Sequence, residues 1–133
     1  MSSKGRWRVD FARSFDPYGP LPKSVILDVM VDDRTTFEAT ETVVGADGKV
    51  AKETIRATYD GKPYPVEGSP HSFTVAMSRL PDGSQRMELS TPDGLHGVEI
   101  CRPSRDLETL TCDETDTDRK GVGTQARSVY VRD

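Results

Sequence analysis

Four Asp-Gly pairs divide the 133-residue chain, and the segments between them alternate apolar and polar residues. The pairs are Asp47-Gly48, Asp60-Gly61, Asp82-Gly83 and Asp93-Gly94. Asp-Gly tolerates the positive φ of tight turns, so each pair predicts a reversal of the chain between two strands. No window of eleven residues has the spacing of an amphipathic helix. The chain is therefore predicted to be all-β.

Apolar residues recur at every second position in these segments, which is typical of strands with one buried face. In residues 25–31 the repeating positions are Val25, Leu27, Val29 and Val31. We expect strands near residues 6–10, 24–31, 35–44, 50–59, 63–66, 71–79, 85–91, 95–102, 108–114 and 122–131.

The lengths of the turns follow from the requirement that paired strands keep their apolar faces on one side. A three-residue loop at 46–48 pairs Val43 with Ala51 and satisfies this requirement, whereas a two-residue loop does not. Glycine then takes the left-handed position of the turn. Loops of equal length at 81–83 and 32–34 pair Met77 with Met87 and Val29 with Phe37.

Consecutive hairpins of this kind predict an antiparallel up-and-down meander that hides its edges by closing. We expect one domain over residues 1–133, a barrel of about 8–10 strands, with a β-sandwich as the alternative. Residues 1–4 are expected to be disordered or to come from an expression tag.

The stretch GRWRVDFARS at 5–14 holds the only tryptophan, in a Gly5-x-Trp7 pattern before a proline-rich loop. With GPLPKS at 19–24, YDGKPYPVEG at 59–68 and SRDLETLT at 104–111, it resembles bacterial lipocalin-like proteins of the calycin type, whose function is unknown. The resemblance implies a barrel with room for a cavity.

The resemblance also implies that an arginine near the last strand packs across the tryptophan. Gly5, Trp7 and Arg127 would then form the plug at one end of the barrel, although Arg132 is as close to the chain end. The sequence departs from its relatives at Asp106-Leu107, where they tend to have Asp-Gly.

Cys101 and Cys112 flank the turn at Asp106-Leu107. A two-residue loop there sets them opposite each other and allows a disulfide, whereas a three-residue loop puts them on opposite faces. Leucine resists positive φ and so favours the second arrangement. A disulfide would also require an exported protein.

Charged residues interrupt three apolar faces. Glu41, Arg79 and Glu99 continue such faces, where they either reach solvent at the barrel rim or meet a ligand. In the second case Arg79 would hold a ligand carboxylate with two hydrogen bonds. The predicted ligand-binding set is Phe37, Glu41, Phe73, Arg79, Met87 and Glu99.

Other chemistry has little support in the sequence. A net charge of −4 with scattered Lys and Arg argues against nucleic acid, and no apolar run approaches the roughly 20 residues of a membrane helix. His71 and His96 are far apart, and 113–121 lacks the spacing of a calcium loop, so neither a metal nor a cofactor is expected. His71 is expected to cap or lie exposed, and no catalytic residue is assigned.

Three functions remain. The first is a non-enzymatic barrel that binds a small hydrophobic or amphipathic ligand. The second is a solid barrel that acts as a protein-interaction or envelope-associated module, and the third is an enzyme at the barrel mouth.

The start MSSKGRW has no apolar signal core, so the chain reads as cytoplasmic, or as periplasmic or secreted after removal of a signal peptide. Monomer and dimer both stay open.

Overall fold

In the computed structural model, residues 2–69 and 72–133 are described, and ten antiparallel strands form one sheet. The residues described contain one short 3₁₀ helix, η1 (Phe11–Arg13), so the all-β prediction is confirmed. The strands are β1 (Gly5–Val9), β2 (Ser24–Asp32), β3 (Thr36–Val44), β4 (Val50–Thr58), β5 (Pro63–Pro65), β6 (Thr74–Arg79), β7 (Gln85–Ser90), β8 (His96–Pro103), β9 (Thr109–Thr117) and β10 (Gly123–Arg132).

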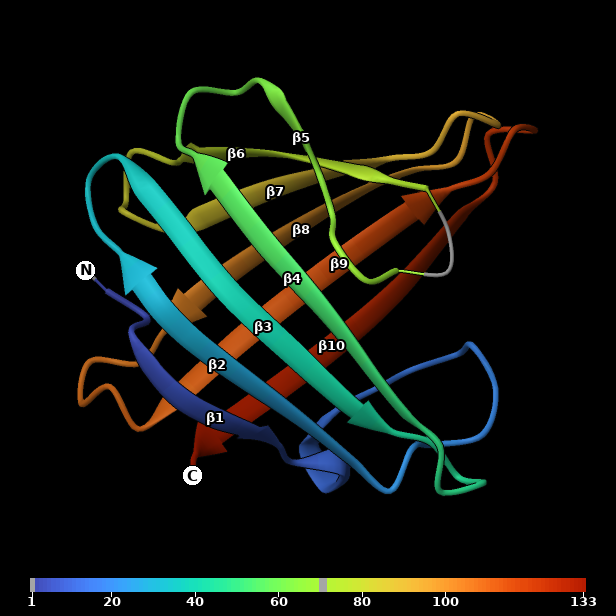
Figure 1. Cartoon of the computed structure of the whole chain (residues 1–133), viewed down its shortest axis with the longest axis horizontal. Coiled ribbons are helices and arrows are strands. Elements are labelled where there is room, and N and C mark those ends of the chain that lie inside the picture. The colour runs from blue at the N-terminus through green and yellow to red at the C-terminus, as the bar shows by residue number, and fades with distance from the viewer. Residues whose placement is uncertain (1, 70–71) are drawn as a thin grey trace.

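The sheet curls into a nearly closed barrel (Figure 1). Its strand order is β4-β3-β2-β1-β10-β9-β8-β7-β6-β5, so the first and last strands pair in the middle and β4 and β5 are the edges. Thr54 and Glu67 bridge the gap between the edges with two backbone hydrogen bonds of 2.8 and 2.9 Å. The barrel prediction is confirmed over the sandwich.

Two of the three predicted turn registers are confirmed. Val43 pairs with Ala51 and Met77 with Met87. Gly48 and Gly83 have φ of 83° and 86°, the left-handed conformation that the three-residue loops require.

The third predicted register, at residues 32–34, is wrong. A β-bulge between Val29 and Val31 shifts the pairing, so Val29 faces Ala39 and Asp32 faces Phe37. The extra residue of a bulge changes which side chains point inward. Here it turns the Asp32 side chain into the closed end of the barrel.

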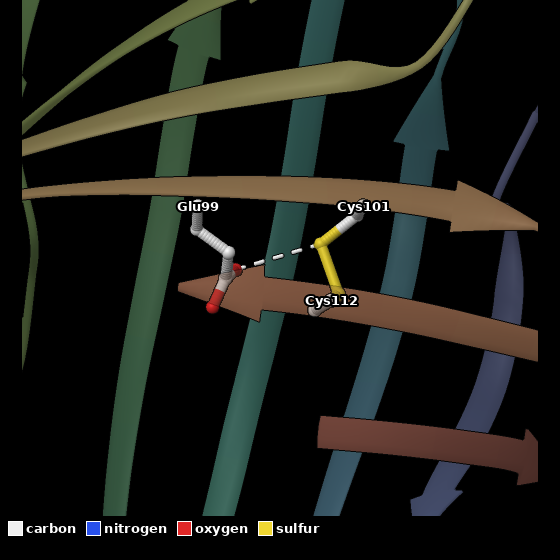
Figure 2. Close-up of side chains that lie close together, drawn as sticks. All are labelled: Glu99, Cys101 and Cys112. Carbon is white, nitrogen blue, oxygen red and sulfur yellow. Dashed lines mark hydrogen bonds between the residues drawn. A yellow bond between two sulfur atoms is a disulfide. The ribbon is translucent and has the colours of Figure 1, made fainter. Parts of the chain in front are cut away.

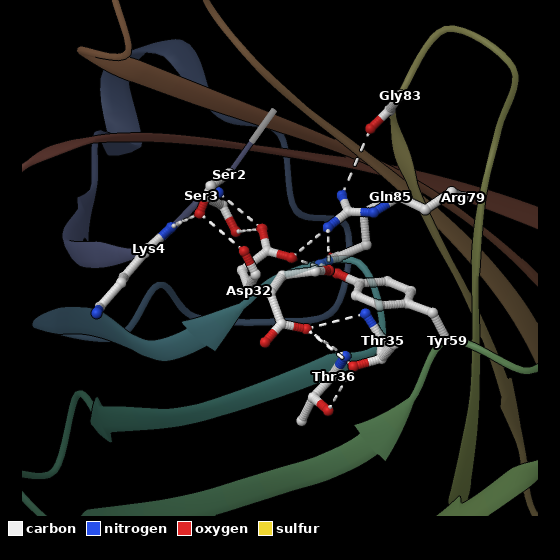
Figure 3. Close-up of polar contacts among 11 residues, drawn as sticks. Ser2, Ser3, Lys4, Asp32, Thr35, Thr36, Tyr59, Arg79, Gly83 and Gln85 are labelled. Atoms are coloured by element: carbon white, nitrogen blue, oxygen red, sulfur yellow. Dashed lines mark hydrogen bonds and ion pairs between the residues drawn. The ribbon is translucent and has the colours of Figure 1, made fainter.

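Asp32 is the centre of a buried polar network at this end (Figure 3). The Ser3 backbone N–H and hydroxyl both donate to Asp32 Oδ2 at 2.7 Å. Tyr59 and Arg79 donate to Oδ1, and Gln85 donates to the Tyr59 hydroxyl at 3.0 Å. The expectation of disorder in residues 1–4 is wrong for Ser3, which is buried because its polar atoms satisfy the carboxylate of Asp32.

Trp7 is fully buried, and the residue that covers it is Arg132. The Arg132 guanidinium lies 3.8 Å from the indole centroid and donates to the backbone carbonyls of Lys4 and Leu107. The assignment of this role to Arg127 is wrong. Arg132 faces Trp7 directly across β1 and β10, whereas Arg127 pairs with Asp113 on the outer surface.

Among the residues that the structure describes, no helix is long and apolar enough to cross a membrane.

Gly5 gives a test of this packing. Its φ is +132°, and a Cβ there would lie 2.0 Å from Arg132 Nη1. We expect Gly5→Ala to lower the free energy of unfolding by about 3 kcal/mol, measured in urea, because the substitution adds overpacking to an unfavourable φ. Gly61→Ala is the control, since Gly61 has φ +74° and open space around it, and should cost about 1 kcal/mol. Equal costs at the two sites would contradict the packing.

Candidate ligand-binding cavity

The end of the barrel away from Trp7 holds a cavity of about 380 Å³. Inward side chains of most strands line it, together with Phe11, Leu21, Pro22 and Phe73 from the connecting segments. The cavity reaches Ser3 and Gln85, and between Asp32, Arg79 and Pro103 at the other end lies a space of only about 10 Å³. The interior is therefore filled at one end and hollow at the other.

A wider mouth of about 1010 Å³ adjoins the cavity. The two share Glu53, Phe73, Leu89 and Glu114, so these four side chains lie between the interior cavity and the surface. Exposed apolar residues rim the mouth: Tyr18, Leu95 and Val122.

Tyr18 ties the β1–β2 connection to the mouth. Its hydroxyl donates to Asp116 Oδ2 at 2.6 Å, on β9. Burial and the negative charge of Asp116 raise the pKa of Tyr18 to about 12. The connection therefore lies across part of the mouth and is anchored there.

The structure brings together five of the six residues predicted to bind a ligand. Phe37, Glu41, Phe73, Met87 and Glu99 all line the cavity. Arg79 does not, so the idea that it holds a ligand carboxylate is wrong. Its guanidinium pairs with Asp32 at the closed end and lies 4.2 Å from the Tyr59 ring centroid.

Besides Asp16 on the β1–β2 connection, two further carboxylates that the sequence analysis did not single out line the cavity. Glu53 lies directly opposite Glu41 across β3 and β4, and Glu114 lies directly opposite Glu99 across β8 and β9. The alternation of side chains along a strand could have identified both, since Glu53 is on the same face as Ile55 and Glu114 is on the same face as Cys112.

These four residues form two pairs of like charge. Directly opposed like charges destabilise a sheet, and removing carboxylates from bulk water raises the cost. Within the residues that the structure describes, no side chain or backbone N–H donates a hydrogen bond to the carboxylate of Glu41 or Glu99. The sulfur of Cys101 lies near Glu99, but it carries no hydrogen because it belongs to a disulfide. Both carboxylates face the open cavity.

This arrangement raises the pKa values of the carboxyl groups that line the cavity. Burial, and then the charge of Glu53, raise the pKa of Glu41 to about 7. Burial, and then the charge of Glu41, raise the pKa of Glu99 to about 7. Burial and the charge of Glu99 raise the pKa of Glu114 to about 8, and burial also raises the pKa of Tyr130 beside them.

Basic groups do not balance these charges. Among the described residues that line the cavity, Arg127 is the only Lys or Arg. Its Nε and Nη2 atoms donate to Asp113 at 2.6 and 3.0 Å, and the side chain is 56% exposed. The guanidinium charge is therefore neutralised outside the cavity.

Cys101 and Cys112 lie opposite each other and form a disulfide in the cavity wall (Figure 2). The connecting turn runs from Ser104 to Thr109, with Leu107 at φ 59°. The expectation that leucine would avoid positive φ is wrong. The loop between Ser104 and Thr109 is longer than the two-residue loop considered above, but it gives the same strand pairing and so sets the two cysteines opposite each other.

Glu99 Oε1 lies 3.5 Å from the sulfur of Cys101. Glu99, Cys101 and Cys112 are the one group of described residues whose potential metal-ligating atoms all lie within 4.8 Å of one another. A metal would need thiolates, and in the disulfide neither sulfur is one.

The one histidine among the described residues, His96, does not line the cavity. His96 lies on the rim of the mouth, 45% exposed, with Nε2 3.5 Å from Glu88. His71 lies outside the described residues.

Ten antiparallel strands, a plugged end and a hollow end define a calycin-type barrel. The structure is similar to that of zebrafish ileal bile acid-binding protein complexed with cholic acid, with a TM-score of 0.58 and 13% sequence identity over 98% of each chain. This likeness concerns the fold. No protein-family model and no curated protein sequence matches the chain.

The raised carboxyl pKa values predict an unusual dependence of stability on pH. The folded state binds protons more tightly than the unfolded state, whose carboxyl groups have a pKa near 4.5. Stability is therefore present at low pH and is lost as pH rises through about 7 to 8. We expect a melting temperature at least about 4 °C higher at pH 5.5 than at pH 8, or about 1 kcal/mol.

A triple variant checks the source of this effect. Glu41→Gln, Glu99→Gln and Glu114→Gln together should flatten the profile between pH 5.5 and 8, measured by thermal unfolding. The control changes the same number of charges on the outside, with Glu38→Gln, Glu67→Gln and Glu108→Gln, and should keep the profile. A profile that is already flat in the unmodified protein would contradict the prediction.

Proposed function

We propose that the protein is a non-enzymatic carrier, lipocalin-like in its mode of action, that binds one small amphipathic molecule in the cavity. The observation that carries this proposal is a partly apolar interior cavity that adjoins a wide mouth and shares four lining residues with it. A cavity of about 380 Å³ is within the range that small ligands occupy in proteins, roughly 300–1,000 Å³.

The distribution of side chains supports a ligand with two unlike parts. Apolar side chains such as Ile55, Met87 and Leu89 line the cavity, where a hydrocarbon body would lose contact with water. Glu53 and Glu114, which line both the cavity and the mouth, would meet a polar group. The similarity to a barrel crystallised with cholic acid adds support from the fold.

Catalysis is the weaker alternative. Carboxyl groups with a raised pKa are suited to proton transfer. However, a nucleophile activated by a neighbouring base is not found among the described residues of the cavity, and the imidazole of His96, on the rim of the mouth, is directed to Glu88. We therefore propose binding without chemical turnover.

A role in protein interaction is the second candidate, and the mouth favours it. Phe15 is 62% exposed and Leu21 51% exposed on the β1–β2 connection, and Val122 on the rim of the mouth is 59% exposed. Such residues suit a protein partner as well as the passage of an amphipathic ligand. A hollow interior is unnecessary for a partner that binds only the rim.

Binding of Nile red, a neutral apolar dye, tests the carrier proposal. We expect saturable binding of one dye per chain, with enhanced fluorescence. Leu89→Trp, at the junction of cavity and mouth, should weaken binding by about tenfold or more because the larger ring fills the passage.

Thr115→Trp is the matched control, since Thr115 is exposed on the outer face of β9 between inward neighbours. It should bind the dye as the unmodified protein does, and circular dichroism should show both variants folded. Absence of saturable binding in the unmodified protein would refute the proposal. Trp7 fluorescence is unsuitable as the signal, because the indole does not line the cavity.

A further inference from the structure

The barrel interior carries more negative groups than a ligand-binding cavity needs for polarity alone. Glu41 and Glu53 belong to one wall, and Glu99 and Glu114 belong to another. The charge of Glu41 acts on both Glu99 and Glu114, so the two pairs interact across the interior.

From these two facing pairs, and from the absence of a free basic group among the described lining residues, we infer that the cavity selects an amphipathic organic cation, such as a primary amine with an apolar body. This inference rests on the proposed carrier function and names the chemical class of its ligand.

Electrostatics gives the direction of selection. A cation placed between the two pairs would gain attraction from both walls, and a carboxylate ligand would meet repulsion from both. A neutral alcohol would gain hydrogen bonds but no net charge interaction. The expected order of affinity is therefore amine, then alcohol, then carboxylate.

The spacing of the carboxylates favours an organic cation over a bare metal ion. The described part of the chain contains no group of three carboxylates whose oxygen atoms all lie within 4.8 Å of one another. An ion such as Ca²⁺ needs six to eight oxygen ligands at about 2.3–2.6 Å, so it would require the walls to move. An ammonium group with an attached chain needs only hydrogen-bond distances to some of these oxygens.

The groups that face a bound cation come from five strands and from the β1–β2 connection. They are Asp16 on that connection, Glu41 on β3, Glu53 on β4, Glu99 on β8, Glu114 with Asp116 on β9, and Tyr130 on β10. At neutral pH the raised carboxyl pKa values keep part of this set protonated. A cation would favour the ionised carboxylates, so its binding should release protons to the solvent.

Three probes with the same ten-carbon chain test the inference: decylamine, decanol and decanoate. Each is titrated against the Nile red complex of the full-length protein at pH 7.5. We expect decylamine to bind at least about tenfold more tightly than decanol, and decanoate to bind most weakly. Calorimetry in two buffers of different ionisation enthalpy should show proton release with decylamine and none with decanol.

Glu41→Gln with Glu99→Gln should reduce decylamine affinity by about tenfold or more and leave decanol affinity within about twofold. Glu38→Gln with Glu67→Gln removes the same charge from outer positions and should change neither. Unfolding curves at pH 7.5 verify that both double variants are folded.

The outcomes separate the inference from the carrier proposal. Equal binding of decylamine and decanol, or tightest binding of decanoate, would overturn the inference and leave the carrier function standing. Decylamine binding that is unaffected by the inner substitutions would also overturn it, since the amine would then adsorb on the acidic surface. Failure of Nile red and all three probes to bind would overturn the carrier function itself.

Discussion

The hydrogen-bonded register of the ten strands is the constraint on which the rest of the structure depends. In a barrel every side chain points either to the interior or to the outside, and a shift of one residue exchanges the two sets. Trp7 faces Arg132, Glu41 faces Glu53 and Cys101 faces Cys112 because of this register. The plug, the acidic cavity and the disulfide are therefore consequences of one pairing scheme.

The two ends of the interior show how differently buried charge is treated in one protein. At the closed end, Asp32 receives hydrogen bonds from Ser3, Tyr59 and Arg79, so its charge is fully compensated. At the hollow end, Glu41 and Glu99 face each other's charge with no such donors among the described residues. Compensated charge is typical of a structural role, whereas uncompensated charge beside open space favours a binding role.

Much of the fold could be predicted because period two and the turn residues act locally. Gly48 and Gly83 marked their turns, and Met77 and Met87 could be paired by counting residues. The bulge before Asp32 was not predictable in this way, since it is stabilised by Ser3 and Arg79, which are distant in sequence. The sequence also could not show that Arg79 pairs with Asp32 at the closed end, so it predicted Arg79 in the ligand site.

Side chains at odd and even positions of a strand point to opposite faces, and this alternation explains the remaining differences between the predicted and the observed site residues. Strict counting along β10 would have favoured Arg132 over Arg127, since only Arg132 shares the inward face of Tyr130. Counting along β4 and β9 would likewise have found Glu53 and Glu114.

The number of acidic residues in the interior could thus be read from the sequence, but their mutual opposition could not, because it requires the register of both walls. That opposition distinguishes this cavity from an apolar one of the same volume. A sheet that places glutamates directly opposite each other loses stability, and alternating the same residues with threonine or leucine would avoid the loss. The cost is offset if a cation occupies the space between the walls, because ligand binding stabilises the folded state that holds the carboxylates together.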